Sequence, residues 1–256
     1  MSDHTKIATI ILAAGMGKRM NNPNLPKVLA TLNSKPLLGY VLDVSTKIDS
    51  QFTVVVVGHK KELVQDFVQS YNNSTIQCVV QVEQLGTGHA AQQAETALAT
   101  FDKNGLVVIL SGDVPLIQAE TLTTLLSFHS KNSFQLTLIS TILENPKGYG
   151  RLVRNENGDF LSIVEEKDAS DSEKLITEIN SGIYCIEHKY LFSLLERIQN
   201  SNAQGEFYLT DLVKIFRQKS LSVGALIHNN SIEISGINTE EERKNLEAIF
   251  LKRKND

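Results

Sequence analysis

Residues 7–20 read IATIILAAGMGKRM: an apolar run ends in two glycines, and two cations follow them. An apolar run rich in isoleucine predicts a β-strand that is covered on both faces. The glycines predict a tight turn in which backbone N–H groups can approach oxygen atoms, and the cations could neutralise a polyphosphate. The stretch therefore predicts a first strand and a phosphate-binding loop, with a plain structural turn as the alternative.

Further apolar runs alternate with helical patterns through the first half of the chain. Similar strands are predicted at residues 53–58, 76–82 and 106–111. Apolar residues recur with helical spacing at 36–49, 60–71, 88–100 and 119–130. Because strands that alternate with helices form βαβ units, this half predicts an α/β fold with a mainly parallel, Rossmann-like sheet.

After about residue 134 the pattern becomes richer in strands. Strands are predicted at 135–141, 150–155, 160–166, 180–186, 220–227 and 232–237, and helices at 188–199 and 206–219. The NENG sequence at 155–158 predicts a hairpin turn. Near the end, Thr239 and Glu242 have the spacing of a capping box for a helix over 239–254. We expect one domain with a β-rich insertion that supplies a lid or a second binding wall.

The composition limits the classes of function. The chain has 256 residues, a net charge of −4 and 41% hydrophobic residues, and no apolar run is long enough to span a membrane. These values argue against a nucleic acid or a membrane as partner. The two cysteines, Cys78 and Cys185, lie far apart without metal-ligand spacing, which favours a reducing compartment. We expect a cytoplasmic protein that is a monomer or a small homo-oligomer.

One segment departs from the acidic average. Residues 4–42 contain five cations and no Asp or Glu. Such a cluster in an acidic protein indicates a local site for an anion, and chance clustering on a solvated surface is the alternative.

The glycine loop fits neither of the two best-known phosphate motifs. A dinucleotide loop needs a third glycine, but Met20 stands at that position. A P-loop needs a hydroxyl residue after Gly-Lys, but Arg19 follows Lys18. What remains is a strand, an Ala-Ala-Gly-x-Gly turn, two cations and, a few residues later, Lys27.

Polar residues downstream point to the same chemistry. Asp113 follows the strand at 106–111, and open α/β sheets bind ligands at the carboxyl ends of their strands. A carboxylate beside phosphates suits Mg²⁺. The QLGTGHA sequence at 84–90 is a second glycine turn that opens a helix and could approach a base or a phosphate. Glu165 and Asn180 lie at strand ends and suit recognition of sugar hydroxyl or amide groups, although each alone could be structural.

Nine motifs in order resemble one known family. They resemble the uridylyltransferase half of bacterial N-acetylglucosamine-1-phosphate uridyltransferase, over residues 7–240. The motifs are LAAGMGKRM, LPKVL, QVEQLGTGHA, SGDVPLI, GYGRLVR, IVEEKDA, EINSGIY, NAQGEFYLTD and GINT.

The resemblance implies a reaction and a set of site residues. UTP and N-acetylglucosamine 1-phosphate would give pyrophosphate and UDP-N-acetylglucosamine, a precursor of cell wall and lipopolysaccharide. Arg19 would act on the leaving phosphates and Lys27 on the transferred one. The nucleotide would contact Leu12, Ala13, Ala14, Gly15, Gln81, Gly86, Thr87 and Gly112. The sugar pocket would contain Gly150, Glu165 and Asn180, and Mg²⁺ would be held by Asp113 and Asn238.

The resemblance also implies a division of the chain. Residues 1–237 would form the nucleotidyltransferase domain, with a nucleotide-binding part at about 1–133 and a sugar-binding part at about 134–237. Residues 238–256 would form a C-terminal helix. The family's acetyltransferase half has no counterpart in this sequence, so we expect no acetyl transfer. Two alternatives stay open: a related enzyme with another sugar or nucleotide, and a non-catalytic nucleotide-binding module.

Overall fold

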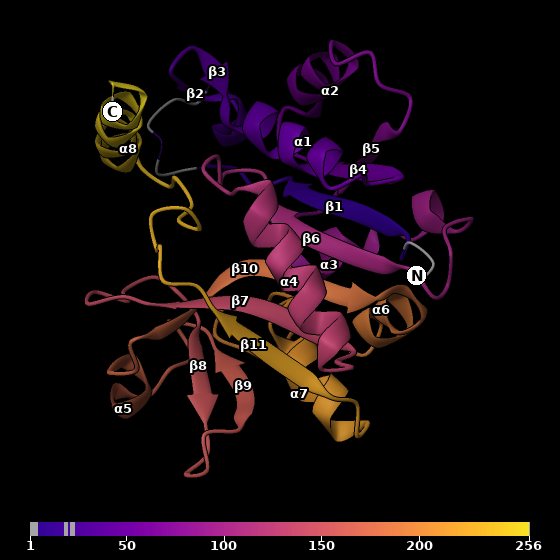
Figure 1. Ribbon diagram of the computed structural model, residues 1–256, viewed down its shortest axis with the longest axis vertical. Helices are drawn as coiled ribbons and strands as arrows, with labels where there is room; N and C mark the ends of the chain where they lie inside the picture. The colour runs from indigo at the N-terminus through magenta and orange to yellow at the C-terminus, as the bar shows by residue number, and fades with distance from the viewer. Residues whose placement is uncertain (1–4, 18–19, 21–23, 256) are drawn as a thin grey trace.

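The computed structural model describes residues 5–17, 20 and 24–255, with side chains described as far as Ile249. In this part of the chain one large sheet contains β1 (Ile7–Ala13), β4 (Phe52–Val57), β5 (Ile76–Val80), β6 (Leu106–Ser111), β7 (Leu136–Ile142), β8 (Arg151–Arg154), β9 (Phe160–Val164), β10 (Glu178–Glu187) and β11 (Val223–Ile227). The strand order is β11-β7-β10-β6-β1-β4-β5, and the β8–β9 hairpin is attached to β10 (Figure 1). The fold is therefore mixed α/β, as the sequence predicts.

The first half of the chain builds the parallel part of the sheet around β1. β1 pairs in parallel with β4 and β6, and β4 pairs in parallel with β5. Ile10 and Ile11 are both fully buried, and they belong to separate apolar cores on opposite faces of the sheet. The run around β1 is apolar because both faces of this strand are buried, as the sequence predicts. All four carboxyl ends meet at one edge of the sheet.

Helices cover both faces of this sheet (Figure 1). The core that contains Ile11 also takes apolar side chains from α1 (Leu37–Lys47), α2 (Lys61–Gln69) and α4 (Ala119–Lys131). The core that contains Ile10 takes them from α3 (Thr87–Gln92), α6 (His188–Leu195) and α7 (Asp211–Gln218). None of the helices in the described residues is long and apolar enough to cross a membrane.

The second half of the chain extends the same sheet through β10. This strand runs antiparallel between β6 and β7, and β11 pairs in parallel with β7. β8 and β9 form the predicted hairpin, in which the Asn155 N–H donates to the Asp159 carbonyl at 3.0 Å. The short helix α5 (Asp171–Lys174) follows β9. The strand-rich segment after residue 134 therefore joins the sheet of the first half.

Residues 232–234 lie in a turn and residues 235–237 have no regular secondary structure, so the predicted strand there is wrong. Glu233 is buried, and its carboxylate accepts hydrogen bonds from the Thr121 hydroxyl and from the Gln118 N–H at 3.1 Å. Its other oxygen lies 3.1 Å from Nε2 of His228. These contacts fix the segment to the start of α4, and Ile234 and Ile237 are buried without a strand partner.

Three predicted helices are clearly shorter than their patterns, and the one predicted at 188–199 ends at Leu195. The helix predicted at 206–219 begins only at Asp211, because the Phe207 N–H donates to the Leu85 carbonyl at 2.7 Å instead of joining the helix. The helix predicted at 88–100 ends at Gln92 and is followed by a 3-10 turn at Thr96–Leu98.

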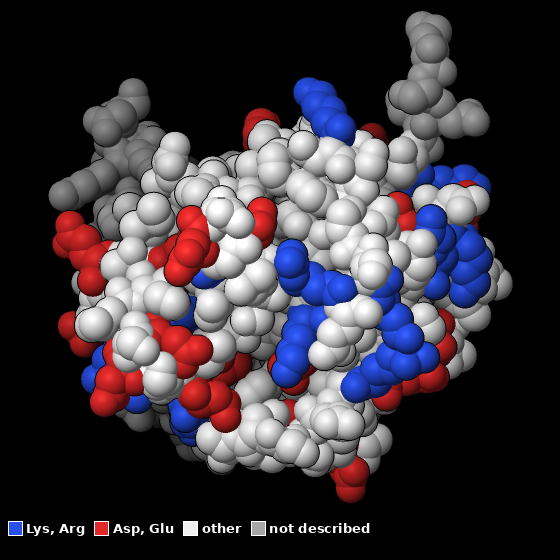
Figure 2. Space-filling model, turned by 90° about the horizontal axis from the view of Figure 1, so that it is seen from below, with Lys and Arg blue, Asp and Glu red and all other residues white. Residues whose placement is uncertain are grey.

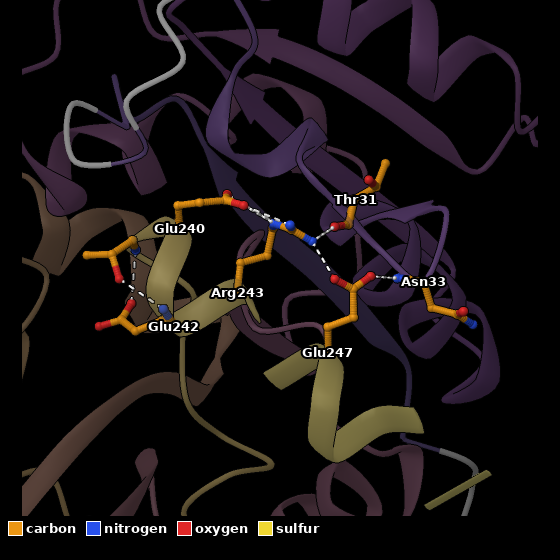
Figure 3. A network of polar contacts seen from close by, with 7 residues as sticks. Thr31, Asn33, Glu240, Glu242, Arg243 and Glu247 are labelled. Atoms are coloured by element: carbon orange, nitrogen blue, oxygen red, sulfur yellow. Dashed lines mark hydrogen bonds and ion pairs between the residues drawn. The ribbon is translucent and has the colours of Figure 1, made fainter. Parts of the chain in front are cut away.

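The last helix, α8 (Glu240–Asn255), is tied to a distant part of the chain (Figure 3). Its predicted capping box is confirmed: the Glu242 N–H donates to the Thr239 hydroxyl at 3.1 Å, and the Thr239 N–H donates to the Glu242 carboxylate at 3.0 Å. Arg243 donates to Glu240 at 2.7 Å, to Glu247 at 2.9 Å and to the Thr31 carbonyl at 3.0 Å. Thr31 belongs to a small hairpin of β2 (Thr31–Leu32) and β3 (Lys35–Pro36), so α8 is fixed to the segment that follows Lys27.

Candidate active site

A first cavity of about 290 Å³ opens at the carboxyl ends of β1 and β6. Most of the residues that the sequence assigns to nucleotide binding and phosphate chemistry line it. These are Leu12, Ala13, Ala14, Gly15, Lys27, Gln81, Gly86, Thr87 and Asp113. Sequence reasoning missed the other lining residues, which are Met16, Val28, Gln84, Ala90, Ser111 and Glu206. All six lie inside the nine sequence motifs given above.

A second cavity of about 210 Å³ adjoins the first and is lined by strand ends of the second half. It contains Glu165, Asn180 and Asn238 from the predicted set. The residues that sequence reasoning missed include Tyr149, Ser181, Gly182, Tyr184, Leu209 and Thr210. Four residues line both cavities: Leu12, Thr87, Ser111 and Asp113. Two molecules bound in these cavities would therefore meet at the end of β6.

Lys27 stands at this junction between two oxygen atoms. Its Nζ forms an ion pair with the Asp113 carboxylate and donates to Oδ1 of Asn238 at 3.1 Å. The side chains of Lys27 and Asp113 are 16% and 9% exposed, so little water shields this pair. The loop after β1 packs against Lys27: a Cβ on Gly17 would lie 2.7 Å from Cβ of Lys27, and Gly17 has a φ of +60°. Glycine at this position lets the loop come close to the lysine.

The same two oxygens suit a divalent cation. Asp113 and Asn238 converge on one cation in this structure, the Lys27 ammonium, so their geometry allows a shared positive ligand. Both are hard oxygen donors, and Mg²⁺ commonly takes one or two protein oxygens together with substrate phosphates and water. The described residues contain no group of three or more His, Cys, Asp or Glu side chains that could hold a metal ion.

Two distant segments form the wall of the first cavity around Gly86. The Gly88 N–H donates to the Phe207 carbonyl at 2.7 Å, and the Leu209 N–H donates to the Thr87 hydroxyl at 3.0 Å. Gly86 has a φ of +110°, and a Cβ there would lie 2.7 Å from the Phe207 carbonyl oxygen. The QLGTGHA and QGEFYLTD motifs are therefore two halves of one structural unit.

Polar groups in the second cavity are partly bonded to each other. The Thr210 hydroxyl donates to Glu165 at 3.0 Å. Burial raises the pKa of the Glu165 carboxyl, and the nearby Asp168, Asp211 and Glu206 raise it further. Asn180 donates from Nδ2 to the Tyr184 hydroxyl at 2.8 Å, and its Oδ1 accepts the Gly182 N–H at 3.1 Å, which fixes the orientation of the amide.

Three predicted site residues stand apart from these cavity walls. Gly112 lines neither cavity, but its N–H donates to the Leu12 carbonyl at 2.9 Å and so joins the ends of β6 and β1. Gly150 also lines neither, but its carbonyl accepts from the Asn180 N–H at 2.9 Å, and a Cβ there would lie 3.4 Å from the Glu165 carboxylate. Arg19 lies outside the described residues.

The cationic N-terminal segment is not a single anion site. Lys35 pairs with Asp43, and Lys6 lies 3.4 Å from Asp102, and neither lysine lines the two cavities. Among the cations of this segment that the structure describes, Lys27 lines the first cavity. Lys18 lies outside the described residues. On the face that Figure 2 shows, the largest group of Lys and Arg side chains lies right of the centre, and Asp and Glu side chains are most concentrated on the left.

Comparison with known proteins identifies the class to which this fold and site belong. A family model described as "Nucleotidyl transferase" matches residues 8–231, and the chain belongs to this family. A solved UDP-glucose pyrophosphorylase complexed with UDP-glucose has the same fold, with a TM-score of 0.76 at 17% sequence identity. That alignment covers 97% of this chain and 99% of the other.

More similar relatives are bifunctional bacterial proteins. The "Bifunctional protein GlmU" of Clostridioides difficile (strain 630) is 42% identical over 247 residues, which cover 96% of this chain and 52% of the relative. The protein of the same name from Pelobacter propionicus is 44% identical over 97% of this chain and 53% of its own length. The chain spans about half the length of these relatives, and this homology confirms the resemblance that its motifs indicate.

Proposed function

We propose that this chain catalyses uridylyl transfer from UTP to N-acetylglucosamine 1-phosphate, with release of pyrophosphate. One observation carries the proposal: two adjoining cavities share a wall at Asp113, where the Asp113 carboxylate and Oδ1 of Asn238 converge on the Lys27 ammonium. Membership of the nucleotidyl transferase family and homology to GlmU support the reaction type.

The proposed chemistry needs no protein nucleophile. An oxygen of the sugar phosphate attacks the α-phosphorus of UTP and forms the new P–O bond. The bond from the α-phosphorus to the bridging oxygen breaks, and pyrophosphate leaves with the electron pair. The protein then has to align the two substrates and stabilise the charge that develops on the phosphate oxygens. Lys27 is placed for this second task, and Arg19 is proposed to bind the leaving phosphates.

The first cavity would take the nucleotide. The backbone from Leu12 to Gly15 lines it. Because the side chains of Ala13, Ala14 and Gly15 are small, phosphate oxygens could approach the backbone N–H groups there. Gln81 and Gly86 lie on the same wall and would read the uracil. The triphosphate would then extend from the base toward Lys27.

The second cavity would take the sugar. Glu165 and Asn180 present carboxylate and amide groups there, and Thr210 adds a hydroxyl. Hydroxyl and amide groups of an amino sugar suit this set of donors and acceptors. Gly150 would keep space next to the Glu165 carboxylate. The sugar-binding part at about 134–237 and the nucleotide-binding part at about 1–133 would thus each supply one cavity.

Asp113 and Asn238 would hold Mg²⁺, which when bound supplies charge neutralisation for the phosphates. The free thiols of Cys78 and Cys185 agree with the reducing, cytoplasmic setting that we propose for this reaction.

A substrate matrix tests the proposal. Four nucleoside triphosphates are each combined with N-acetylglucosamine 1-phosphate, glucose 1-phosphate and other sugar 1-phosphates in the presence of Mg²⁺, and pyrophosphate release is measured. We expect the highest kcat/KM for UTP with N-acetylglucosamine 1-phosphate. Preference for another sugar would move the assignment to a related enzyme. Absence of pyrophosphate from every pair would favour a nucleotide-binding module without catalysis.

A further inference from the structure

The amide of Gln81 has two partners on the same atom. Gln81 is 3% exposed and lines the first cavity. Its Nε2 lies 3.1 Å from the Gly86 carbonyl oxygen and 3.0 Å from Nδ1 of His89. The Gly86 carbonyl also accepts the Ala90 N–H at 3.0 Å, so α3 fixes the position of this carbonyl.

This arrangement determines which way the amide points. A carbonyl oxygen can only accept, so the Gln81 atom that faces Gly86 must be the donor, Nε2. Its second proton points to His89, whose Nδ1 must therefore be an acceptor. The contact thus requires the tautomer of His89 that carries its ring proton on Nε2.

The other end of the amide is left for a ligand. No hydrogen bond to Oε1 of Gln81 occurs within the described residues, so this acceptor is available to a molecule in the first cavity. Uracil carries a donor at N3, whereas cytosine carries a lone pair there. An acceptor held in place attracts the first base and repels the second. A site built in this way discriminates strongly between them, because the wrong base leaves buried polar groups unpaired.

We propose that His89 is a positioning residue for base selection: its Nδ1 holds the Gln81 amide so that Oε1 faces the base and UTP is preferred to CTP. This inference rests on the proposed function, because it assumes that the first cavity binds a nucleoside triphosphate. It adds a specific role for a residue that contacts neither the phosphates nor the proposed metal site.

His89 also has a packing contact, and the experiment must separate it from the hydrogen bond. The ring lies beside Phe207, with centroids 6.4 Å apart. His89→Phe keeps a ring beside Phe207 and removes the acceptor. His89→Asn removes the ring but places Oδ1, an acceptor, near the position of Nδ1. His89→Phe therefore keeps only the ring of the histidine, and His89→Asn keeps only its hydrogen-bond acceptor.

The measurement is kcat/KM for UTP and for CTP in the full chain and both variants. We expect the UTP to CTP ratio to fall on the order of tenfold in His89→Phe, the size of one buried hydrogen bond. KM for UTP should carry this change while kcat changes little, because the base lies away from the reacting phosphorus. His89→Asn should retain most of the ratio. If His89→Phe keeps the wild-type ratio of UTP to CTP and His89→Asn loses it, the histidine is a packing residue and the proposal is wrong.

A second measurement needs no activity. In wild-type protein with ¹⁵N-labelled histidine, two-bond ¹H–¹⁵N correlations report which ring nitrogen carries the proton, and His89→Phe identifies the signal. We expect Nδ1 of His89 to be unprotonated near neutral pH, and a proton on Nδ1 would overturn the inference. If the wild type released no pyrophosphate from UTP, the proposed function would fail, whereas this spectrum would still test the Gln81–His89 contact.

Discussion

At the scale of single residues, the contacts of Lys27 span the sequence. The lysine lies 86 residues before Asp113 and 211 residues before Asn238, and its Nζ contacts both. Lys27→Ala should lower kcat by roughly 10²- to 10³-fold, because it removes a fixed positive charge at the reacting phosphate. Pyrophosphate release at saturating substrate measures this.

Lys35→Ala is the matched control for Lys27→Ala. Lys35 also forms an ion pair, with Asp43, but lines neither cavity. We expect its kcat to stay near that of the wild type. Circular dichroism should show intact folds for both variants. Near-normal turnover of folded Lys27→Ala would remove the role proposed for it.

Glu165 should limit stability at neutral pH. Burial raises its folded pKa above the unfolded value, so its favourable contribution is present at low pH and is lost as the pH rises through the folded pKa. Glu165→Gln should therefore raise Tm by a few degrees at pH 7 and by less at pH 4, while activity falls. Thermal unfolding at several pH values measures the difference.

The neighbouring Glu166 provides a control of opposite sign. A hydrogen bond from Arg151 at 2.6 Å lowers the pKa of the Glu166 carboxyl. Its contribution is present above the unfolded pKa and is lost as the pH falls through the folded pKa, so Glu166→Gln should lower Tm at pH 7. Equal effects of the two substitutions would contradict the assigned environments.

At the scale of elements, the turn at Gly86 joins α3 to the segment before α7. A Cβ there would meet the Phe207 backbone and would also require a left-handed φ, so Gly86→Ala should displace the wall of the first cavity that is proposed to bind the base. We expect KM for UTP to rise about tenfold or more. Gly148→Ala is the control, because Gly148 has a φ of +88° but no heavy atom within 4 Å of the added Cβ. That variant should lose about 1–2 kcal/mol of stability and keep its KM.

The elements that the sequence predicts well are those whose pattern has a local cause. β1, β4 and β6 are covered by helices on both faces, and such strands have continuous apolar runs that stand out in any sequence, whereas the edge strand β5 is only partly covered. The segment at 232–237 has a similar pattern for a different reason. Ile234 and Ile237 are buried in a segment where Glu233 binds Thr121, 112 residues away, and no local pattern reports such a contact.

The candidate site divides in the same way. Asp113 and Gln81 directly follow parallel strands, so their place at one sheet edge follows from the strand pattern. Thr210 and Glu206 enter the cavities because the segment before α7 pairs with residues 85–88, which is a tertiary contact. The contact of His89 with Gln81 depends on the side-chain orientation that the fold imposes, so the motif alone does not reveal it.

At the scale of the whole molecule, Arg243 connects α8 to the β2–β3 hairpin (Figure 3). Arg243→Ala removes the bonds to Glu240, Glu247 and Thr31 together, so hydrogen exchange should become faster both in 238–247 and in 30–35. Lys244→Ala is the control on the next helical position and should leave 30–35 unchanged. Mass spectrometry of exchanged peptides measures both regions. Faster exchange confined to α8 would contradict the connection.

The bond between Lys27 and Asn238 has a consequence for the order in which the protein is made. A ribosome delivers Lys27 early and Asn238 211 residues later, by which time β1, β4, β5 and β6 have all been synthesised. The parallel strands can therefore pair on the nascent chain before Asn238, whose Oδ1 contacts Lys27, has been synthesised. A released chain that ends at residue 237 would keep every strand of the sheet, but it would lack the Asn238 oxygen that contacts Lys27.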